Sequence, residues 1–373
     1  MLYQNVCVEA FAYALPEEVV TSAEIEAMLE PLYTRLRLPQ GRLELMTGIA
    51  QRRFWPRGMP PSQKSIETTG KAIHVAGIDR QHIGALVHGS VCRDFLEPAT
   101  ACGVHHQLGL SDRCAVYDVS NACLGLLSGM VQVANMIELG QIRAGVVVGT
   151  ESSRALVEAT IGHLNADTSL SRNDIKAAFA SLTIGSGSAA VVLCDRELSR
   201  TGNRLLGGVM QTATEHFTLC QGGHGASADA QEQPLMWTDS EALMREGVAA
   251  AQAAFAGFLE EMEWSTGNIH KTFCHQVGRA HHRLLFESLG LEQRMDYSTF
   301  EYLGNTGAVA LPITAAIGIE HGHLQRNDRV AMLGIGSGIN VIMLGVDWQR
   351  SLVENAVHMA GPHVSRRVRE THR

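Results

Sequence analysis

The sequence predicts an α/β protein built from two similar halves, and three observations support this. Short apolar runs rich in β-branched residues alternate with longer amphipathic stretches, as in buried strands joined by helices. The chain has 373 residues, 45% hydrophobic and 18% charged, so it is globular and large enough for one large or two fused medium domains. Strand-like segments also recur at a constant offset of 186 residues (273 − 87), a period of whole-domain size.

The repeat keeps one order in both halves: strand, helix, strand, elbow, helix, strand. Three pairs of segments carry it: Ala85–Val87 with Lys271–Phe273, the segment before Cys123 with Tyr297–Leu303, and Ala144–Val148 with Val330–Gly334. We expect each of them to be a strand. The division that follows is an N-terminal half over 1–200, a C-terminal half over 201–348 and a tail of unknown role over 349–373.

The composition favours an enzyme that acts on small molecules. Thirty Lys and Arg stand against 38 Asp and Glu, and a net charge of −8 argues against a dedicated nucleic-acid binder. No apolar run is long enough to span a membrane, and the N-terminus lacks the features of a signal peptide, so we expect a cytoplasmic protein. Eight irregularly spaced cysteines without a CxxC pair indicate reduced thiols and no metal site.

The most informative residue is Cys123. The run Ala115–Met130 predicts a strand that ends in a small-residue elbow and continues as an amphipathic helix, whose first turn carries this thiol. Because unpaired N–H groups and a partial positive charge lie at a helix N-terminus, we expect a lowered thiol pKa and a nucleophile. The alternative is a buried cysteine that fills apolar space.

Two side chains lie at the matching positions of the second half. Its elbow, Leu303–Ala308, contains Asn305, and the strand before it ends at Phe273–Val277, which contains His275. If a pseudo-twofold axis relates the halves, the elbows face each other across the join, where ligand sites tend to form. Both side chains can then reach Cys123, although they are separated from it in sequence by 152 residues (275 − 123) and a further 30 (305 − 275). Singly, each is as well explained as a core histidine or a turn asparagine.

This set of groups suits acyl transfer. A thiolate at Cys123 attacks a thioester carbonyl, and His275 and Asn305 donate N–H groups to the oxygen on which negative charge develops. The glycine-rich run Leu333–Asn340 lets backbone N–H groups approach a ligand, and we expect the amides of Cys123 and Ser337 to form an oxyanion hole. Dinucleotide binding by this run is disfavoured, because no βαβ unit or acidic residue follows it.

Four motifs occur in order along the chain: Asn121–Cys123, His275–Val277, Gly304–Gly307 and Gly334–Gly338. In order and spacing they resemble the thiolase superfamily, specifically its ketoacyl-ACP-synthase-III-like branch, and the likeness covers residues 1 to about 348. The resemblance implies the thiolase fold, with two pseudo-symmetric αβαβα halves and stacked mixed sheets.

A further stretch, Thr47–Phe54, is similar to the early TGI-x-x-R motif of this branch, near the pantetheine entrance. The resemblance implies that Arg52 and Arg53 contact the phosphates of CoA or of a carrier protein. Solvated surface arginines are the equally acceptable alternative. No bound cofactor is expected, since the CoA thioester is the substrate.

One acid separates two chemistries within the branch. A decarboxylating enzyme obtains its carbanion by loss of CO2, whereas a non-decarboxylating enzyme needs a base to remove an α-proton. The stretch Ser90–Thr100 resembles the olefin-biosynthesis thiolases of the branch, in which the matching glutamate reaches from one subunit into its partner's site. The resemblance therefore implies a homodimer and assigns Glu97 as the base, the alternative being a solvent-facing loop carboxylate.

The resemblance implies an acyltransferase of lipid metabolism that condenses two fatty acyl-CoA thioesters head to head, through a Cys-bound acyl-enzyme, to a 2-alkyl-3-oxoacid. A carrier-protein thioester remains an alternative donor. One rival is decarboxylative condensation of acyl-CoA with a malonyl thioester, as in ketoacyl-ACP synthase III. Another is a catalytically silent thiolase-fold subunit that binds a partner enzyme.

Overall fold

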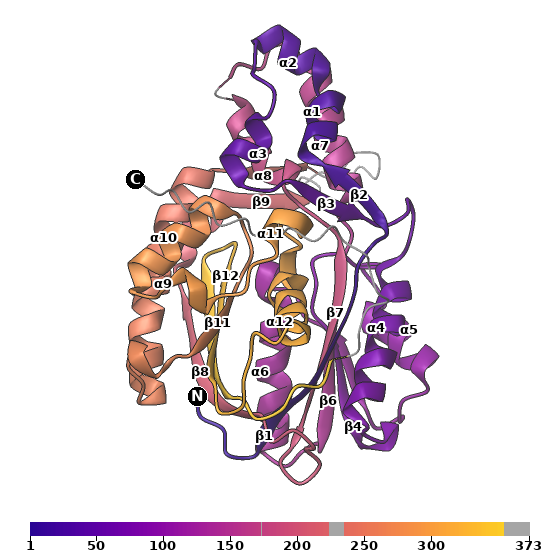
Figure 1. Ribbon diagram of the computed structural model, residues 1–373. Helices are drawn as coiled ribbons and strands as arrows, with labels where there is room; N and C mark the ends of the chain where they lie inside the picture. Colours follow the sequence, from indigo (N-terminus) through magenta and orange to yellow (C-terminus); the bar gives the residue numbers. More distant parts are fainter. Residues whose placement is uncertain (173, 224–234, 354–373) are drawn as a thin grey trace.

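The computed structural model describes residues 1–172, 174–223 and 235–353 and has five layers (Figure 1). Most of the expected tail over 349–373 therefore lies outside the described residues. Two helices, α6 (Gly125–Glu138) and α12 (Ala310–Glu320), form the central layer. Ten of the eleven residues of α12 are buried, because this apolar helix has strands and helices on all sides.

Nine strands of the described chain form one mixed sheet, which bends around the central helices. The N-terminal half contributes, in sheet order, β5 (Ala115–Asp118), β4 (Ile83–His88), β6 (Ala144–Glu151), β7 (Gly187–Asp195) and β1 (Val6–Ala14). The C-terminal half continues with β8 (Arg204–Thr212), β13 (Asn340–Asp347), β12 (Arg329–Gly336) and β11 (Lys271–Cys274). The two sets are joined by the single pairing of Cys7 with Arg204, and we refer to these two parts of the sheet as the first and the second sheet.

The directions of the strands repeat between the halves, which agrees with the repeated order of elements that the sequence predicts. In the first half β4 is parallel to β6, and β6 is antiparallel to β7, which pairs with β1. In the second half β11 is parallel to β12, and β12 is antiparallel to β13, which pairs with β8. The expected α/β architecture with two pseudo-symmetric halves is thus confirmed.

The outer layers are helical and cover the remaining face of each sheet. Helices α4 (Pro61–Ala76) and α5 (Thr100–Leu108) cover the first sheet, while α9 (Ser240–Met262) and α10 (Arg279–Leu289) cover the second (Figure 1). Each pair packs over an apolar cluster of its own, which is distinct from the central cluster around α6 and α12. The catalytic candidates follow the strand ends between these layers.

The remaining elements cap the molecule. They are β2 (Glu18–Thr21), α1 (Ser22–Met28), α2 (Glu30–Leu36), α3 (Arg42–Thr47), β3 (Gln51–Phe54), α7 (Arg154–Ala166), α8 (Phe179–Leu182), β9 (Cys220–Gly223) and β10 (Leu235–Thr238). Helices α1 to α3 project at one end of the molecule and share a small apolar cluster with α7 and α8 (Figure 1). Among the described helices, none combines the length and apolar character needed to cross a bilayer.

The expected strand at Tyr297–Leu303 is wrong. The fifth strand position of the second sheet is reduced to one bridge between Thr272 and Asp296, and Phe300–Leu303 forms the short helix α11. Asp296 ends the pairing because its carboxylate turns inward and accepts hydrogen bonds from Thr272 Oγ1 and the Cys274 amide, at 3.0 and 3.1 Å. The two halves are consequently not equivalent at the point where the first half carries Cys123.

Candidate active site

Cys123 lies in a single 3-10 turn, Ala122–Leu124, between β5 and α6. This agrees with the strand, elbow and helix that the sequence predicts. Ala122 has a positive φ of 43°, a conformation that a residue with a Cβ adopts only when its surroundings enforce it. The strained turn presents the thiol at the start of the buried helix α6.

Strand β12 lies directly beside the cysteine turn. A Cβ added at Gly336 would lie 3.0 Å from Leu124 Cγ and 3.6 Å from the Cys123 nitrogen, so glycine permits this close approach. Ser337 then interacts with the Cys123 thiol through both its backbone and its side chain. The structure therefore brings together the two residues whose amides are expected to form the oxyanion hole.

The expectation of a lowered thiol pKa is wrong. The pKa of the Cys123 thiol is raised to about 12, mainly by burial and in smaller part by the nearby Cys220 and Glu151, while the contacts from Ser337 oppose the rise. Removal from water thus outweighs the helix N-terminus that the sequence suggested. The nucleophile rests as a neutral thiol at neutral pH.

His275 follows the last residue of β11 and is buried. Its backbone N–H donates to Leu333 O of β12 at 3.0 Å, so the strand that leads into Ser337 also holds the histidine. Burial lowers the pKa of the His275 imidazole to about 3, with a further contribution from His281, so the ring is neutral at pH 7. Its Nδ1 atom has no hydrogen-bond partner among the residues that the structure describes.

Asn305 is held by the opposite half of the molecule. Its backbone N–H donates to Thr183 O at 3.0 Å, and its carbonyl accepts from the Gly185 N–H at 2.9 Å. A Cβ at Gly185 would lie 2.0 Å from Leu303 O, so only glycine allows the two segments to approach this closely. The side-chain oxygen accepts from the Gly307 N–H at 2.9 Å, which leaves the Nδ2 amide to donate to a ligand.

The convergence of the three residues follows from these contacts. The cysteine turn packs on β12, which binds the His275 backbone, and on the 3-10 turn Gly307–Val309 directly after Asn305. A neutral imidazole and a carboxamide both supply N–H donors without charge. The arrangement suits stabilisation of a negative oxygen beside a sulfur nucleophile.

Glu97 lies elsewhere in the chain described, on the exposed loop between β4 and α5. Among the described residues, no hydrogen bond or ion pair connects it to Cys123, His275 or Asn305. Its neighbours Phe95 and Leu96 are also exposed, Leu96 to 94%. A loop tip with exposed apolar side chains is typical of a surface that another protein covers.

The structure places Arg52, which we expect to meet a CoA phosphate, away from the molecular surface. Arg52 is 0% exposed, because it occupies an inward position on β3, and its guanidinium donates to Ser22 Oγ at 3.1 Å and, more weakly, to Val20 O. Burial lowers its pKa to about 10. Arg53 is half-buried and donates to Pro16 O at 2.8 Å, so neither arginine is a solvated surface residue, the alternative explanation.

Sequence reasoning missed Glu151, the last residue of β6. Its side chain is buried, and its carboxylate accepts hydrogen bonds from Val91 N, Cys92 N and Ala308 N at 3.0, 3.3 and 3.3 Å. Burial raises the Glu151 pKa, and these hydrogen bonds oppose the rise. An acid directly after the buried run Ala144–Thr150 was the available signal, since the carboxyl ends of strands carry functional groups in α/β folds.

A second buried cluster lies behind His275. Donor atoms of Cys274, His282 and Asp296 lie within 4.8 Å of one another, the one such group in the described ranges that could hold a metal ion. Asp296 Oδ2 is already 3.2 Å from the Cys274 thiol and 2.9 Å from His282 Nε2. The cluster is therefore satisfied as a hydrogen-bond network that anchors the strand end before His275.

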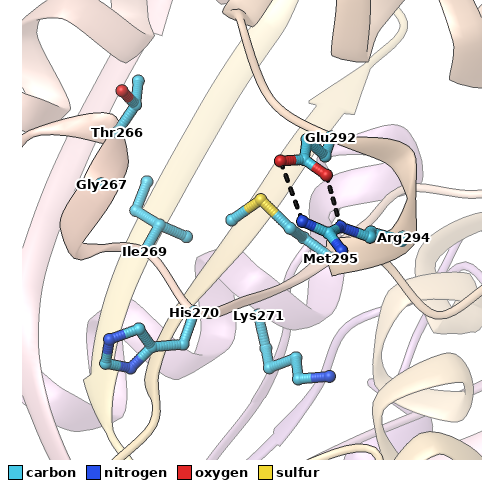
Figure 2. A pocket seen from close by; sticks show the side chains of 8 residues that line it. All are labelled: Thr266, Gly267, Ile269, His270, Lys271, Glu292, Arg294 and Met295. Carbon is cyan, nitrogen blue, oxygen red and sulfur yellow. Dashed lines mark hydrogen bonds and ion pairs between the residues drawn. The ribbon is translucent and has the colours of Figure 1, made fainter.

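A surface cavity of about 450 Å³ lies near the start of β11 and contains an ion pair between Glu292 and Arg294 (Figure 2). His275 follows the other end of this short strand. The cavity is thus separate from the cysteine site.

The chain matches two family models: the thiolase N-terminal domain over residues 63–176, and the 3-oxoacyl-[acyl-carrier-protein] synthase III C-terminal domain over residues 259–348. It is 42% identical to an acyl-CoA:acyl-CoA alkyltransferase of Shewanella oneidensis, over 93% of this chain and 100% of that protein. A protein of the same name from Xanthomonas campestris is 35% identical over 93% of this chain and 100% of that protein.

Solved structures of Xanthomonas campestris OleA superpose with a TM-score of 0.87. Cerulenin-bound OleA is 35% identical and matches 93% of this chain and 98% of its own. A cysteine-to-serine variant of OleA with bound lauric acid and lauroyl-CoA is 34% identical and matches 93% of this chain and 100% of its own. The chain is an acyltransferase of the thiolase superfamily and belongs to the family of acyl-CoA:acyl-CoA alkyltransferases that includes OleA.

Proposed function

We propose that this protein condenses two fatty acyl-CoA molecules head to head, without loss of CO2, to a 2-alkyl-3-oxoacid. In the first step the sulfur of Cys123 attacks the carbonyl of one thioester. The S–C bond to CoA breaks, the thiol proton leaves with CoA as CoASH, and an acyl group remains on Cys123. The amides of Cys123 and Ser337 donate to the acyl oxygen.

The second step forms the carbon–carbon bond. Glu97 removes a proton from the α-carbon of a second acyl-CoA, and the enolate attacks the carbonyl carbon of the Cys123 thioester. The bond to the cysteine sulfur breaks, the sulfur takes up the proton that Glu97 removed, and His275 and Asn305 donate to the oxygens that carry negative charge during the step. Hydrolysis of the remaining CoA thioester gives the 2-alkyl-3-oxoacid and a second CoASH.

The base is delivered in trans in this proposal. Glu97 has no contact with the cysteine site of its own chain, and the apolar side chains beside it are exposed. A homodimer would cover Phe95 and Leu96 and place Glu97 of the partner subunit beside the acyl-enzyme. The eight free cysteines of the chain are consistent with a reducing, cytoplasmic location.

The spacing between Glu97 and Cys123 gives the most direct support for Glu97 as the base. Structures of Xanthomonas campestris OleA include variants of one glutamate and of one cysteine, and in that chain the glutamate precedes the cysteine by 26 positions. Glu97 precedes Cys123 by the same 26 positions (123 − 97). A further variant of that protein replaces a histidine.

By contrast, a β-ketoacyl-ACP synthase III of Bacillus cereus is only 25% identical to this chain, over 92% of this chain and 99% of that protein.

The test is incubation with a single long-chain acyl-CoA and no malonyl donor. We expect CoASH release, a condensed product of two acyl chains, and one acyl group on Cys123 in the intact-protein mass. The Cys123→Ala variant should show none of these, and the Glu97→Gln variant should be acylated but should not condense. A strict need for a malonyl thioester would favour decarboxylative condensation instead, and the absence of any acyl group on Cys123 after exposure to acyl-CoA would favour a silent subunit.

A further inference from the structure

Glu151 is a buried carboxylate without a cation. No Lys, Arg or His of the described chain forms an ion pair with it, although its side chain is excluded from water. Removing an ionised carboxylate from water is costly unless hydrogen bonds replace those of the solvent. Its hydrogen bonds come from two separate segments, and both lead to residues of the proposed reaction.

The first segment is the start of the loop that carries Glu97. The N–H groups of Val91 and Cys92 donate to the two carboxylate oxygens of Glu151 at 3.0 and 3.3 Å, and the Cys92 thiol interacts with the same group. Glu97 lies only five residues after Cys92 (97 − 92). The Glu151 carboxylate thus fixes the first residues of a loop whose tip is exposed.

The second segment is the turn that follows Asn305. The Ala308 N–H donates to Glu151 Oε1 at 3.3 Å. A Cβ at Gly307 would lie 3.3 Å from Glu151 Cγ, Cδ and Oε1, so the turn packs directly on the carboxylate. Because Gly307 also holds the Asn305 side chain, the same acid supports the orientation of the oxyanion donor.

Three backbone N–H groups and one thiol surround the two oxygens of Glu151, which leaves little capacity to accept a substrate proton. Its chemistry is therefore that of an anchor. Glu151 also lies close enough to Cys123 to act on it electrostatically.

We propose that Glu151 is a positioning residue that serves two active sites at once: it orients Asn305 beside Cys123 of its own subunit, and it holds the loop that delivers Glu97 to the partner subunit. This inference rests on the proposed function, specifically on a homodimer with the base in trans.

The test uses mixed dimers formed by subunit exchange. One subunit carries Cys123→Ala and supplies Glu97, and the other carries Glu97→Gln and supplies Cys123, so a mixed dimer has one complete site. Glu151→Gln is then added to either subunit. On the subunit that supplies Glu97, we expect normal acylation of Cys123 and condensation slower by about tenfold, the effect of a misplaced base. On the subunit that supplies Cys123, we expect acylation itself to slow by about tenfold, because Asn305 and the thiol are disturbed.

A pH profile separates positioning from a general loss of folding. Because the buried Glu151 carboxylate raises the Cys123 pKa, Glu151→Gln should move the alkylation of Cys123 by iodoacetamide to lower pH. The matched control is Glu260→Gln, an exposed acid on the outer helix α9, which should change none of these quantities. Glu151→Asp, which keeps the charge, should leave the alkylation profile closer to that of the unsubstituted protein.

The outcomes that overturn the inference are distinct. If Glu151→Gln changes condensation by less than about twofold in both placements, the positioning role is wrong. If it abolishes condensation only on the subunit that supplies Cys123, with normal acylation, Glu151 is itself the base. If the reference mixture without any Glu151 substitution is inactive after verified exchange, delivery in trans fails, and the inference fails with it.

Discussion

The contact between Gly125 and Gly89 predicts that Gly125→Ala destabilises the folded protein, although replacing glycine by alanine in a helix usually stabilises it. Gly125 is the first residue of α6, two positions after Cys123, with helical φ and ψ of −52° and −46°. Alanine at a helical position normally stabilises by about 1 kcal/mol relative to glycine. Here a Cβ would lie 2.6 Å from Gly89 O, a backbone atom that cannot rotate away.

The size of the effect follows from this distance. Ordinary contacts begin near 3.4 Å, so the end of β4 and the start of α6 would have to separate by about 0.8 Å (3.4 − 2.6). Overpacking of this kind costs about 1–3 kcal/mol. The matched control is Gly162→Ala in α7, because a Cβ there meets nothing within 4 Å. We expect Gly125→Ala to be less stable than Gly162→Ala by about 1–3 kcal/mol, because only the added methyl group at Gly125 overpacks against the backbone.

Activity should fall as well, because the displaced backbone carries the nucleophile. A shift of about 1 Å at a reacting group can cost about 100-fold in rate, so we expect acylation of Cys123 in Gly125→Ala to slow by about 10- to 100-fold. Urea unfolding followed by circular dichroism measures the stability, and intact-protein mass spectrometry measures acylation over time. If Gly125→Ala is as stable as Gly162→Ala and is acylated at the normal rate, the close approach does not constrain the site.

Three further predictions concern buried ionisable side chains. Arg52→Met should change KM for acyl-CoA by less than about twofold. It should leave the unfolding midpoint unchanged or raised, because a buried charge without an ion-pair partner is removed. A large rise in KM would instead show that Arg52 contacts a CoA phosphate. Asp296→Asn should lower stability by about 1–3 kcal/mol in urea unfolding, since the buried groups around it lose an acceptor; an unchanged midpoint would show that the network contributes nothing. Burial lowers the pKa of His88, His275 and His281 to about 4, 3 and 4, so their neutral forms favour the folded state. Their contribution to stability is complete above about pH 6.5 and falls by ~1.4 kcal/mol per pH unit per histidine as the pH drops from there toward 4. Equal unfolding midpoints at pH 7 and pH 5 would contradict this.

The sequence was sufficient for the residues that lie in short contiguous motifs. Cys123 follows a strand and an elbow that are read from adjacent residues, and His275 and Asn305 each lie in a motif of only a few residues. The repeat placed all three at matching positions of the two halves, and the structure brings these positions together around β12. Such local signals survive folding because each depends on a few neighbouring residues.

Properties that depend on burial were not predictable in this way. The sign of the Cys123 pKa shift is set by how much water the surrounding layers exclude, which no local pattern records. Arg52 lies next to Arg53 in the sequence, and this pair predicts two surface residues. In the structure the side chains of β3 alternate between the two faces of the strand, and that of Arg52 points inward. Glu151 contacts residues 60 and 157 positions away, so its role appears only when three segments are folded together.

The departure from symmetry between the halves is what builds the site. In the first half β5 completes the sheet and leads directly into the turn of Cys123. If the second half had formed the matching strand, the chain before Asn305 would be paired along β11. Instead the pairing stops at Asp296, and the released chain forms α11 and crosses to the first half, where Asn305 bridges to Ile184 and Ala308 reaches Glu151. A truncated strand in one half thus allows an oxyanion donor to lie beside the nucleophile that the complete strand presents in the other.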